Sequence, residues 1–494
     1  MKTGQNLKTE NLKSDIVVIG GGGAGMTAAI AASEAGTNEI VVLEKAAKTG
    51  GNTALAHGIF GVNSPAQKRL GIKVSRDEVF TRQMSNSRWL VDPRLVKAFV
   101  DQSGAMIQWL EDKGMRFNTI VDEFLPGGSS FFHSVGQGFA GAVGPVIAET
   151  LIKECQKRGI KVLCETAAEE ILVDNQGKVK GVLAKGQDKE IKITAKSVII
   201  AAGGFGGNKE MLKKRFPLSE GVTGNTLPQM TGDGLVMAEK AGAFINDYYS
   251  ILLIGPSYNE QVAFSLGMLL MQPEIILVNK NGERYCDESL FLNNHNYSGN
   301  SLSRQPEKKC YALLDAGIKQ QIIQNKKPHS GFFKSFGGNG AWLNDLDKQL
   351  QQETTSGNIK TVGTLEEIAG FVGAEPSVLA STIQQYNSYC ERGYDADFLK
   401  NRQFLFPFNT PPYYAVPGHQ NFDTTLGGIR INQRMEVLDR QVKPIGGLYA
   451  AGDNAGSWLS QNYDLEHPGS ALSFALSSGY IAGQNAAKYV TSRT

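Results

Sequence analysis

Short runs of apolar, often β-branched residues alternate with glycines near the start of the chain. Residues 15–19 (DIVVI) form the first run, and residues 20–25 are nearly all glycine. An alanine-rich stretch follows at 26–33, and a second apolar run lies at 39–44 (EIVVLE). Short, continuous apolar runs are typical of buried parallel strands, and the alanine-rich stretch favours a helix. The order strand, glycine turn, helix and strand predicts a βαβ unit.

Two later segments repeat the pattern of an apolar run that ends in glycines, at 197–204 and 446–453. We expect them to join the first strands in one parallel sheet. Between them lies a stretch richer in Asn, Gln, Lys and aromatic residues, with a helix-like run at 365–392. The pattern predicts an α/β protein: a Rossmann-like nucleotide-binding domain (parallel sheet with helices) interrupted by an inserted α+β domain. The predicted parts are a polar N-terminal arm (1–14), the first part of the nucleotide-binding domain (15–270), the inserted domain (271–424) and the second part (425–494).

Composition excludes several classes of protein. The chain has 494 residues, 41% hydrophobic and 20% charged, which is enough to form cores. Its 50 basic and 48 acidic residues leave a net charge of +2, so we expect no nucleic-acid partner. The five cysteines form no CxxC motif, which argues against zinc, cluster and haem sites and favours a reducing compartment. The N-terminus is polar and the first apolar run is too short to span a bilayer. We therefore expect a cytoplasmic protein with no membrane span and no metal.

The glycine turn carries the first chemical signal. Gly20, Gly22 and Gly25 form a GxGxxG motif between a predicted strand and a predicted helix, and Glu44 ends the next strand. One glycine makes the turn, one lets the backbone approach a pyrophosphate, and one lets helix and strand pack closely. The helix N-terminus offers N–H groups to the phosphates, and Glu44 is placed to accept from ribose hydroxyls. These features predict a dinucleotide site.

Several motifs together identify a resemblance that spans most of the chain outside the middle domain. They are Gly20–Gly25, Glu44-Lys45, Gly50-Gly51-Asn52, Ala201–Gly204, Thr231–Gly234 and Gly447–Asp453. With them the chain resembles the flavoprotein family of fumarate reductases, succinate dehydrogenases and ketosteroid dehydrogenases. The resemblance implies FAD as the cofactor and an inserted domain that caps the substrate. Members with covalent flavin carry a histidine where this chain has Asn52, so the resemblance implies non-covalent FAD.

The resemblance also implies which residues bind FAD. Asp453 would hold the ribitol, residues 469–471 would begin a helix that points at the pyrimidine ring, and His57 would lie beside the isoalloxazine. The implied FAD-binding residues are Gly20, Gly22, Gly23, Ala24, Gly25, Glu44, Lys45, Gly51, Asn52, Thr53, His57, Gly58, Ala202, Gly203, Asp233, Gly452, Asp453, Gly469, Ser470, Ala471 and Leu472.

The chain departs from the family where fumarate reductases grip a dicarboxylate. Phe291 stands where a relay arginine is expected, and Gly317 or Ile318 where an arginine proton donor is expected. A histidine expected just before Gly427 is missing, with Asp423 close upstream, and His467 corresponds to a substrate arginine. A bidentate grip on carboxylates needs guanidinium groups, so fumarate and succinate are poor candidates.

Three residues are candidates for catalysis. Tyr463 resembles the ketosteroid dehydrogenase tyrosine that, with a backbone N–H, polarises a substrate carbonyl; alternatively it only packs its ring. His467 precedes Pro468 and is either a substrate contact or a helix-capping histidine. Glu288 matches the family's proton-relay glutamate, although a surface salt bridge is the simpler interpretation because its arginine partner is absent.

The sequence therefore predicts an FAD-dependent oxidoreductase that acts on CH–CH or C=C bonds next to a carbonyl. The first hypothesis is an ene reductase that passes hydride from flavin N5 to a fairly apolar, non-dicarboxylate small molecule. The alternatives are a ketosteroid-dehydrogenase-like desaturase, an electron-transfer flavoprotein subunit, and a flavin-binding protein that has lost catalysis. Because no second dinucleotide, haem or cluster motif is found in the sequence, electrons are expected to come from or pass to an external donor or acceptor.

Overall fold

The strands that the sequence predicts lie together in one six-stranded sheet. The structure is a computed structural model that describes residues 8–121, 130–136, 142–217, 222–258, 263–325, 329–336, 338–460, 463 and 465–492. The strands in sheet order are β18 (Glu436–Leu438), β19 (Pro444–Ala450), β11 (Ser197–Ile200), β2 (Ile16–Ile19), β3 (Ile40–Leu43) and β7 (Lys161–Leu163). Only the β18–β19 pair is antiparallel. Because β11 pairs with both β2 and β19, the prediction that the glycine-ended strands share a sheet is confirmed.

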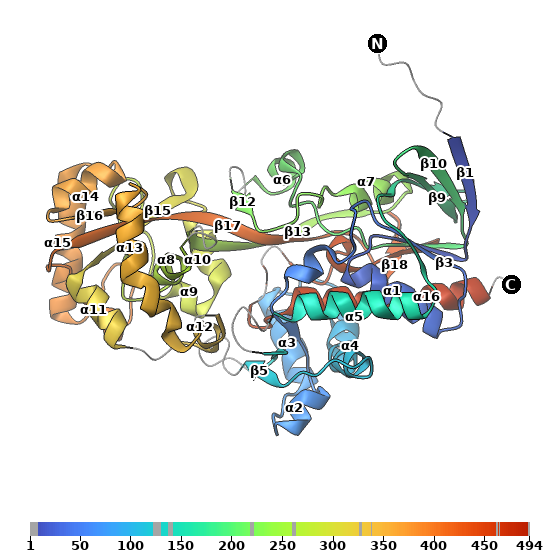
Figure 1. The fold of residues 1–494 in the computed structure, drawn as a ribbon, viewed down its shortest axis with the longest axis horizontal. Helices are drawn as coiled ribbons and strands as arrows, with labels where there is room; N and C mark the ends of the chain where they lie inside the picture. The colour runs from blue at the N-terminus through green and yellow to red at the C-terminus, as the bar shows by residue number, and fades with distance from the viewer. Residues whose placement is uncertain are drawn as a thin grey trace, which may run out of the picture.

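Helices cover this sheet because its central strands are apolar on both faces. Every residue of β2, β3 and β11 is buried. The predicted first helix is present as α1 (Gly23–Glu34), which packs against α5 (Val143–Lys157) and α16 (Ser470–Thr491). Figure 1 shows these three helices alongside one another, with α4 (Pro93–Glu111) beyond them. Apolar side chains of strands and helices form the first hydrophobic core.

Part of the predicted polar arm is a strand. Residues 8–13 form β1 and pair in parallel with β10 (Lys189–Thr194), at the edge of a four-stranded sheet with β9 (Val179–Lys185) and β8 (Ala167–Val173). The arm is too polar to be identified as a strand from its hydrophobic pattern. Residues 1–7 of the arm lie outside the described residues.

A second hydrophobic core includes residues from Ala263 to Val416. Its sheet contains β12 (Thr223–Gly224), β13 (Ile245–Ser257), β14 (Ile276–Val278), β15 (Lys309–Asp315), β16 (Lys360–Val362) and β17 (Tyr413–Ile429). The long strands β13 and β17 are antiparallel and run between the two cores (Figure 1). Its helices are α8 (Phe264–Leu270), α9 (Leu290–Asn293), α10 (His295–Leu302), α11 (Ala316–Gln324), α12 (Gly331–Phe336), α13 (Leu346–Thr355), α14 (Leu365–Val372) and α15 (Pro376–Arg392).

The single helix-like run predicted at 365–392 is two helices, α14 and α15. Gly373 ends α14 in the left-handed conformation with φ 84°, and Pro376 occupies the first turn of α15. A glycine after the last helical residue and a proline in the first turn are typical of helix ends and helix starts. They divide an otherwise continuous amphipathic pattern into two helices.

The remaining elements lie around the first core. They are β4 (Ile59–Phe60), β5 (Thr119–Val121), β6 (Phe132–Ser134), α2 (Pro65–Arg69), α3 (Arg76–Asn86), α6 (Lys209–Arg215) and α7 (Asp233–Lys240). Within the described part of the chain, we find no helix with the length and hydrophobicity that a bilayer-spanning segment requires.

Candidate active site

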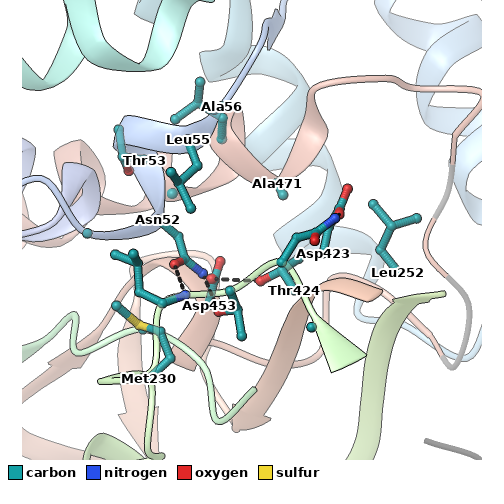
Figure 2. Close-up of a pocket in the computed structure, with 18 of the residues that line it drawn as sticks. Asn52, Thr53, Leu55, Ala56, Met230, Leu252, Asp423, Thr424, Asp453 and Ala471 are labelled. Atoms are coloured by element: carbon teal, nitrogen blue, oxygen red, sulfur yellow. Dashed lines mark hydrogen bonds between the residues drawn. The ribbon is translucent and has the colours of Figure 1, made fainter. Parts of the chain in front are cut away.

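A cavity of about 1200 Å³ opens where the parallel sheet meets β13, β17 and the second core. Its lining comes from the glycine turn after β2, the 51–58 segment, the ends of β11 and β19, and the start of α16. The other wall comes from β13, β17, α8 and α10. Figure 2 shows side chains from both walls facing the same space. Ligands commonly bind at the carboxyl ends of parallel strands, which is where this cavity lies.

The glycine turn forms a cradle of bare backbone. Gly20 has φ 111°, and a Cβ there would lie 2.2 Å from the carbonyl oxygen of Ala201, so no other residue fits without a shift. A Cβ on Gly22, by contrast, would meet no atom closer than 4.0 Å, so its backbone faces open space. Helix α1 begins at the next residue, Gly23, and both glycines line the cavity. This helix N-terminus is suited to a phosphate group.

Two acidic residues lie at the end of the cavity where β3 terminates. Glu44 accepts hydrogen bonds from the backbone N–H groups of Gly21 and Ala46, both at 2.8 Å. Next to it, Lys45 Nζ lies 2.6 Å from Asp233 Oδ2 and 2.6 Å from Thr231 Oγ1. The ion pair neutralises the Lys45 ammonium group within the site.

The 51–58 segment is fixed by side-chain hydrogen bonds. Asn52 donates from Nδ2 to Thr226 Oγ1 at 2.8 Å and accepts from the backbone N–H of Leu227 at 3.1 Å (Figure 2). Thr53 Oγ1 accepts from the backbone N–H of Gly23 at 3.2 Å. These bonds hold the segment against both the glycine turn and the 226–227 loop. Burial lowers the pKa of His57, so its imidazole is favoured in the neutral form.

Asp453 and the start of α16 face the centre of the cavity. Thr424 donates a hydrogen bond to Asp453 Oδ2 at 3.1 Å (Figure 2). Burial raises the pKa of Asp453 to about 6, although the Thr424 hydrogen bond acts in the opposite direction. Gly469 precedes α16 with φ 80°, and a Cβ there would lie 2.7 Å from the nitrogen of Phe60. The first turn of α16 can approach the cavity because this position has no side chain.

Most of the residues predicted to bind FAD line this one cavity, and two do not. Gly25 lies behind it, where a Cβ would be 1.9 Å from the Gly20 carbonyl oxygen, so its part is the close packing of α1 on β2. Ser470 is fully buried, and its hydroxyl donates to Tyr463 Oη at 3.2 Å. The residues that do line it are Gly20, Gly22, Gly23, Ala24, Glu44, Lys45, Gly51, Asn52, Thr53, His57, Gly58, Ala202, Gly203, Asp233, Gly452, Asp453, Gly469, Ala471 and Leu472.

Of the three catalytic candidates, only Tyr463 lines the cavity. Its hydroxyl oxygen accepts a hydrogen bond from the backbone N–H of Ala471 at 3.1 Å. This bond places a phenol next to the N-terminus of α16. Residues 461, 462 and 464 of the same predicted loop lie outside the described residues.

His467 and Glu288 are not among the residues that line the cavity. His467 is buried against the rings of Phe60 and Phe131, and its Nδ1 is 2.9 Å from Gln83 Oε1. Glu288 is buried and is ion-paired with Arg284 at 2.9 Å and with a buried lysine. A surface salt bridge for Glu288 is therefore wrong, because its side chain is 0% exposed.

Most of the wall formed by β13, α8, α9, α10 and α12 was missed by sequence reasoning, although Phe291 is the residue expected at the substrate site in place of an arginine. It contributes mostly apolar side chains, and their pattern in the sequence is indistinguishable from that of ordinary core residues. These are Leu252, Ile254, Phe264, Met268, Met271, Phe291 and Phe332. Tyr258 and His295, in the same wall, stand out in the sequence only as isolated polar aromatic residues.

Three uncharged aromatic side chains, His295, Phe291 and Phe332, pack together in this wall. His295 stacks on Phe291 with ring centroids 4.1 Å apart, and the Phe332 ring meets it edge-on at 4.2 Å. Burial lowers the pKa of His295 to about 3, so the imidazole is uncharged at neutral pH. Among the described residues that line the cavity, Lys45 is the sole arginine or lysine, and it is paired with Asp233.

The cradle side of the cavity fits FAD. The open backbone at Gly22 and the N-terminus of α1 suit a pyrophosphate. Glu44 lies at the end of β3, where it can bind the adenosine ribose that is next to the pyrophosphate in FAD. The N-terminus of α16 suits the electron-rich edge of a reduced isoalloxazine.

Comparison with known proteins agrees with this geometry. Residues 15–467 match a family model described as an FAD binding domain. The chain is 30% identical to the vinyl phenol reductase of Lactiplantibacillus plantarum, over 96% of each chain. It is 31% identical to the urocanate reductase of Eggerthella lenta, over 96% of this chain and 74% of that protein. The structure of a flavocytochrome c3 fumarate reductase in an open conformation superposes with a TM-score of 0.74 and 27% identity, over 97% of this chain and 79% of that one.

The motifs of the chain, the glycine cradle and the family match therefore lead to one conclusion. The chain belongs to the FAD-binding family that includes the fumarate reductases, and it is an FAD-dependent oxidoreductase.

Proposed function

We propose that this protein is an ene reductase for a fairly apolar substrate in which the C=C bond is conjugated with a carbonyl. The observation that carries the proposal is the neutral aromatic wall next to the FAD cradle. A dicarboxylate in this cavity would meet His295 in its neutral form and no unpaired guanidinium or ammonium group among the described lining residues. Burying two carboxylates without cationic partners is strongly unfavourable, so the substrate carries at most one.

When bound, FAD supplies the hydride chemistry of this reaction. The chain contributes binding and charge stabilisation. The Tyr463 hydroxyl and the N-terminus of α16 lie together at the cavity, where they can stabilise negative charge that develops on a substrate carbonyl oxygen. Leu252 and Phe291 exclude water from the apolar body of the substrate.

The relatives support the coarse reaction class. Vinyl phenol reductase and urocanate reductase are named for substrates that contain an unsaturated side chain on a ring. A ring-bearing substrate is consistent with the wall of His295, Phe291 and Phe332. We propose that electrons reach the protein from an external donor.

A desaturase is the second candidate. The pairing of the Tyr463 hydroxyl with the Ala471 N–H is the observation that favours it, since the same polarisation of a carbonyl would also acidify the neighbouring C–H bond. Whether the protein reduces a C=C bond or forms one then depends on the redox potentials of the flavin and the electron partner.

A stopped-flow experiment tests the proposal. The FAD-loaded protein is reduced anaerobically and mixed with an aryl enone, a cinnamate and fumarate, and the return of the oxidised flavin spectrum is followed. We expect fast reoxidation by the enone or the cinnamate and slow reoxidation by fumarate. Fast reoxidation by fumarate alone would refute the proposal, and bleaching of the oxidised protein by a saturated ketone, without enone reduction, would favour the desaturase.

A further inference from the structure

One carboxylate of the cavity has no part in the function proposed above. Asp423 lies on β17 between Phe422, which is buried in the first core, and Thr424, which is bonded to Asp453. Asp423 lines the cavity, and Figure 2 shows it near Leu252, on the opposite side from Asn52. It therefore stands between the FAD cradle and the apolar wall.

A hydrogen-bonded series of two side-chain amides, Asn421 and Asn225, fixes the orientation of this carboxylate. The backbone N–H of Phe422 donates to Asn421 Oδ1 at 2.8 Å, so the Nδ2 of Asn421 is left to donate. It donates to Asn225 Oδ1 at 2.9 Å, and Asn225 Nδ2 in turn donates to Asp423 Oδ1 at 3.0 Å. Because the chain starts at a backbone N–H, the direction of every bond in it is determined. Asp423 is thus held as an acceptor.

Asp423 lacks a cationic partner among the described residues. Its interactions there consist of the Asn225 hydrogen bond, and burial raises its pKa. A half-buried carboxylate whose only described partner is one amide is incompletely hydrogen-bonded, which has a cost. A ligand that donates a hydrogen bond to it would offset part of that cost.

We infer that Asp423 is a specificity-determining residue that accepts a hydrogen bond from an O–H or N–H group on an otherwise apolar substrate. The inference rests on the proposed function, since it needs a substrate that fills the space between the cradle and Leu252. It narrows the substrate class to unsaturated molecules that carry a hydroxyl group, or an equivalent N–H donor, away from the carbonyl. A methoxy group in the same place cannot donate and leaves the carboxylate without a partner.

Ligand binding tests this inference without relying on turnover. The probes are 4-(4-hydroxyphenyl)but-3-en-2-one, its amino and methoxy analogues, and the unsubstituted compound. Dissociation constants are measured from the perturbation of the oxidised flavin spectrum in FAD-loaded wild-type protein, in Asp423→Asn and in Asp188→Asn. Asp188 is an exposed carboxylate between β9 and β10 and is the matched control.

We expect wild-type protein and Asp188→Asn to bind the donor-bearing probes about 10- to 100-fold more tightly than the methoxy probe, since a hydrogen bond to a charged group has that value. Asp423→Asn should lose this preference and keep its affinity for the unsubstituted probe. The Asn225 amide still donates to the new side-chain oxygen, so the new NH₂ group faces the ligand and favours the methoxy probe. Asn225→Ala, which cuts the amide chain, should also weaken the preference.

The outcomes separate this inference from the proposed function. Equal preferences in wild-type protein and Asp423→Asn overturn the inference, as does an equal loss for all probes. A raised dissociation constant for FAD in Asp423→Asn, with the probe preference unchanged, assigns the residue to the cofactor and also overturns it. If the preference depends on Asp423 but no probe reoxidises the reduced flavin, the inference stands and the proposed function fails.

Discussion

Replacing Glu288 with glutamine tests whether this residue is a proton relay or a structural ion. Glu288 accepts from Arg284 in a bidentate pair at 2.9 and 3.0 Å, lies 3.2 Å from Lys400 Nζ, and accepts from the backbone N–H of Leu277 at 3.1 Å. Arg284 also binds Asp395 at 2.9 Å. The side chains of these four charged residues are at most 4% exposed, and their charges sum to zero.

Glu288→Gln leaves two buried cations with a single carboxylate. Removing one partner of a buried ion pair costs about 3–5 kcal/mol. For a cooperative unit of roughly 150–250 residues, this lowers the melting temperature by about 6–20 °C. We expect this shift in thermal unfolding followed by circular dichroism. At a temperature where both proteins are folded, flavin reoxidation by the enone should be unchanged because Glu288 does not line the cavity.

The double variant Glu288→Gln/Lys400→Met is the matched control. It restores the charge balance by leaving the Arg284–Asp395 pair, so it should recover much of the lost stability. If Glu288→Gln instead melts like wild-type protein and slows reoxidation by about 10²–10⁴-fold, the residue is a proton relay and the structural reasoning is wrong.

The stabilisation by Glu288 depends on pH, and its pKa determines the direction of that dependence. Burial alone would raise the pKa of Glu288, but the charges of Lys400 and Arg284 outweigh it and lower that pKa below 4.5. A lowered folded-state pKa stabilises the protein above the unfolded value and loses its effect as the pH falls. The stability difference between wild-type protein and Glu288→Gln should therefore shrink below about pH 4.5.

Three further predictions concern the cavity and the glycine turn behind it. Tyr463→Phe removes a hydroxyl at the N-terminus of α16 and should slow enone reduction by about 10²–10³-fold with an unchanged flavin spectrum; an unaltered stopped-flow rate would exclude this role. Because the pKa of Asp453 is raised to about 6 and ribityl hydroxyls would favour its ionised form, FAD should bind apoprotein more weakly as the pH falls through 6. Fluorescence titration should show that slope in wild-type protein and not in Asp453→Asn, and a flat wild-type profile would contradict it. Gly25→Ala places a Cβ 1.9 Å from the Gly20 carbonyl oxygen and should destabilise the protein by about 1–3 kcal/mol or more; a wild-type melting temperature would show that the turn can shift.

Local patterns were sufficient to predict the nucleotide-binding part of the fold. The apolar runs at 16–19, 40–43 and 197–200 are buried on both faces, so each appears in the sequence as a continuous hydrophobic segment. Glycines after the first and third runs were informative for two reasons. Gly20 and Gly204 leave no room for a Cβ, while Gly22 leaves its backbone open to a ligand. The strand at 8–13 was missed because an edge strand in a solvent-facing sheet carries no such pattern.

The catalytic candidates show the limit of sequence reasoning. Tyr463 lines the cavity as expected, while His467 turns toward Gln83 and Glu288 toward Arg284. Each candidate follows from a motif, but a motif does not state in which direction its side chain points. That direction depends on partners distant in the chain.

The amino-acid sequence by itself determined the cofactor class, because a pyrophosphate cradle is built from a few adjacent glycines and the helix that follows them. Tertiary structure decided what lies opposite the cradle. The Lys45–Asp233 pair joins residues 188 positions apart, and Asn225 reaches Asp423 across 198 positions. Such contacts set the charge of the cavity. The first forms when the start of α7 lies beside the end of β3, and the second when β12 pairs with β17. Substrate choice therefore depends on long-range packing, whereas FAD binding depends on short-range sequence.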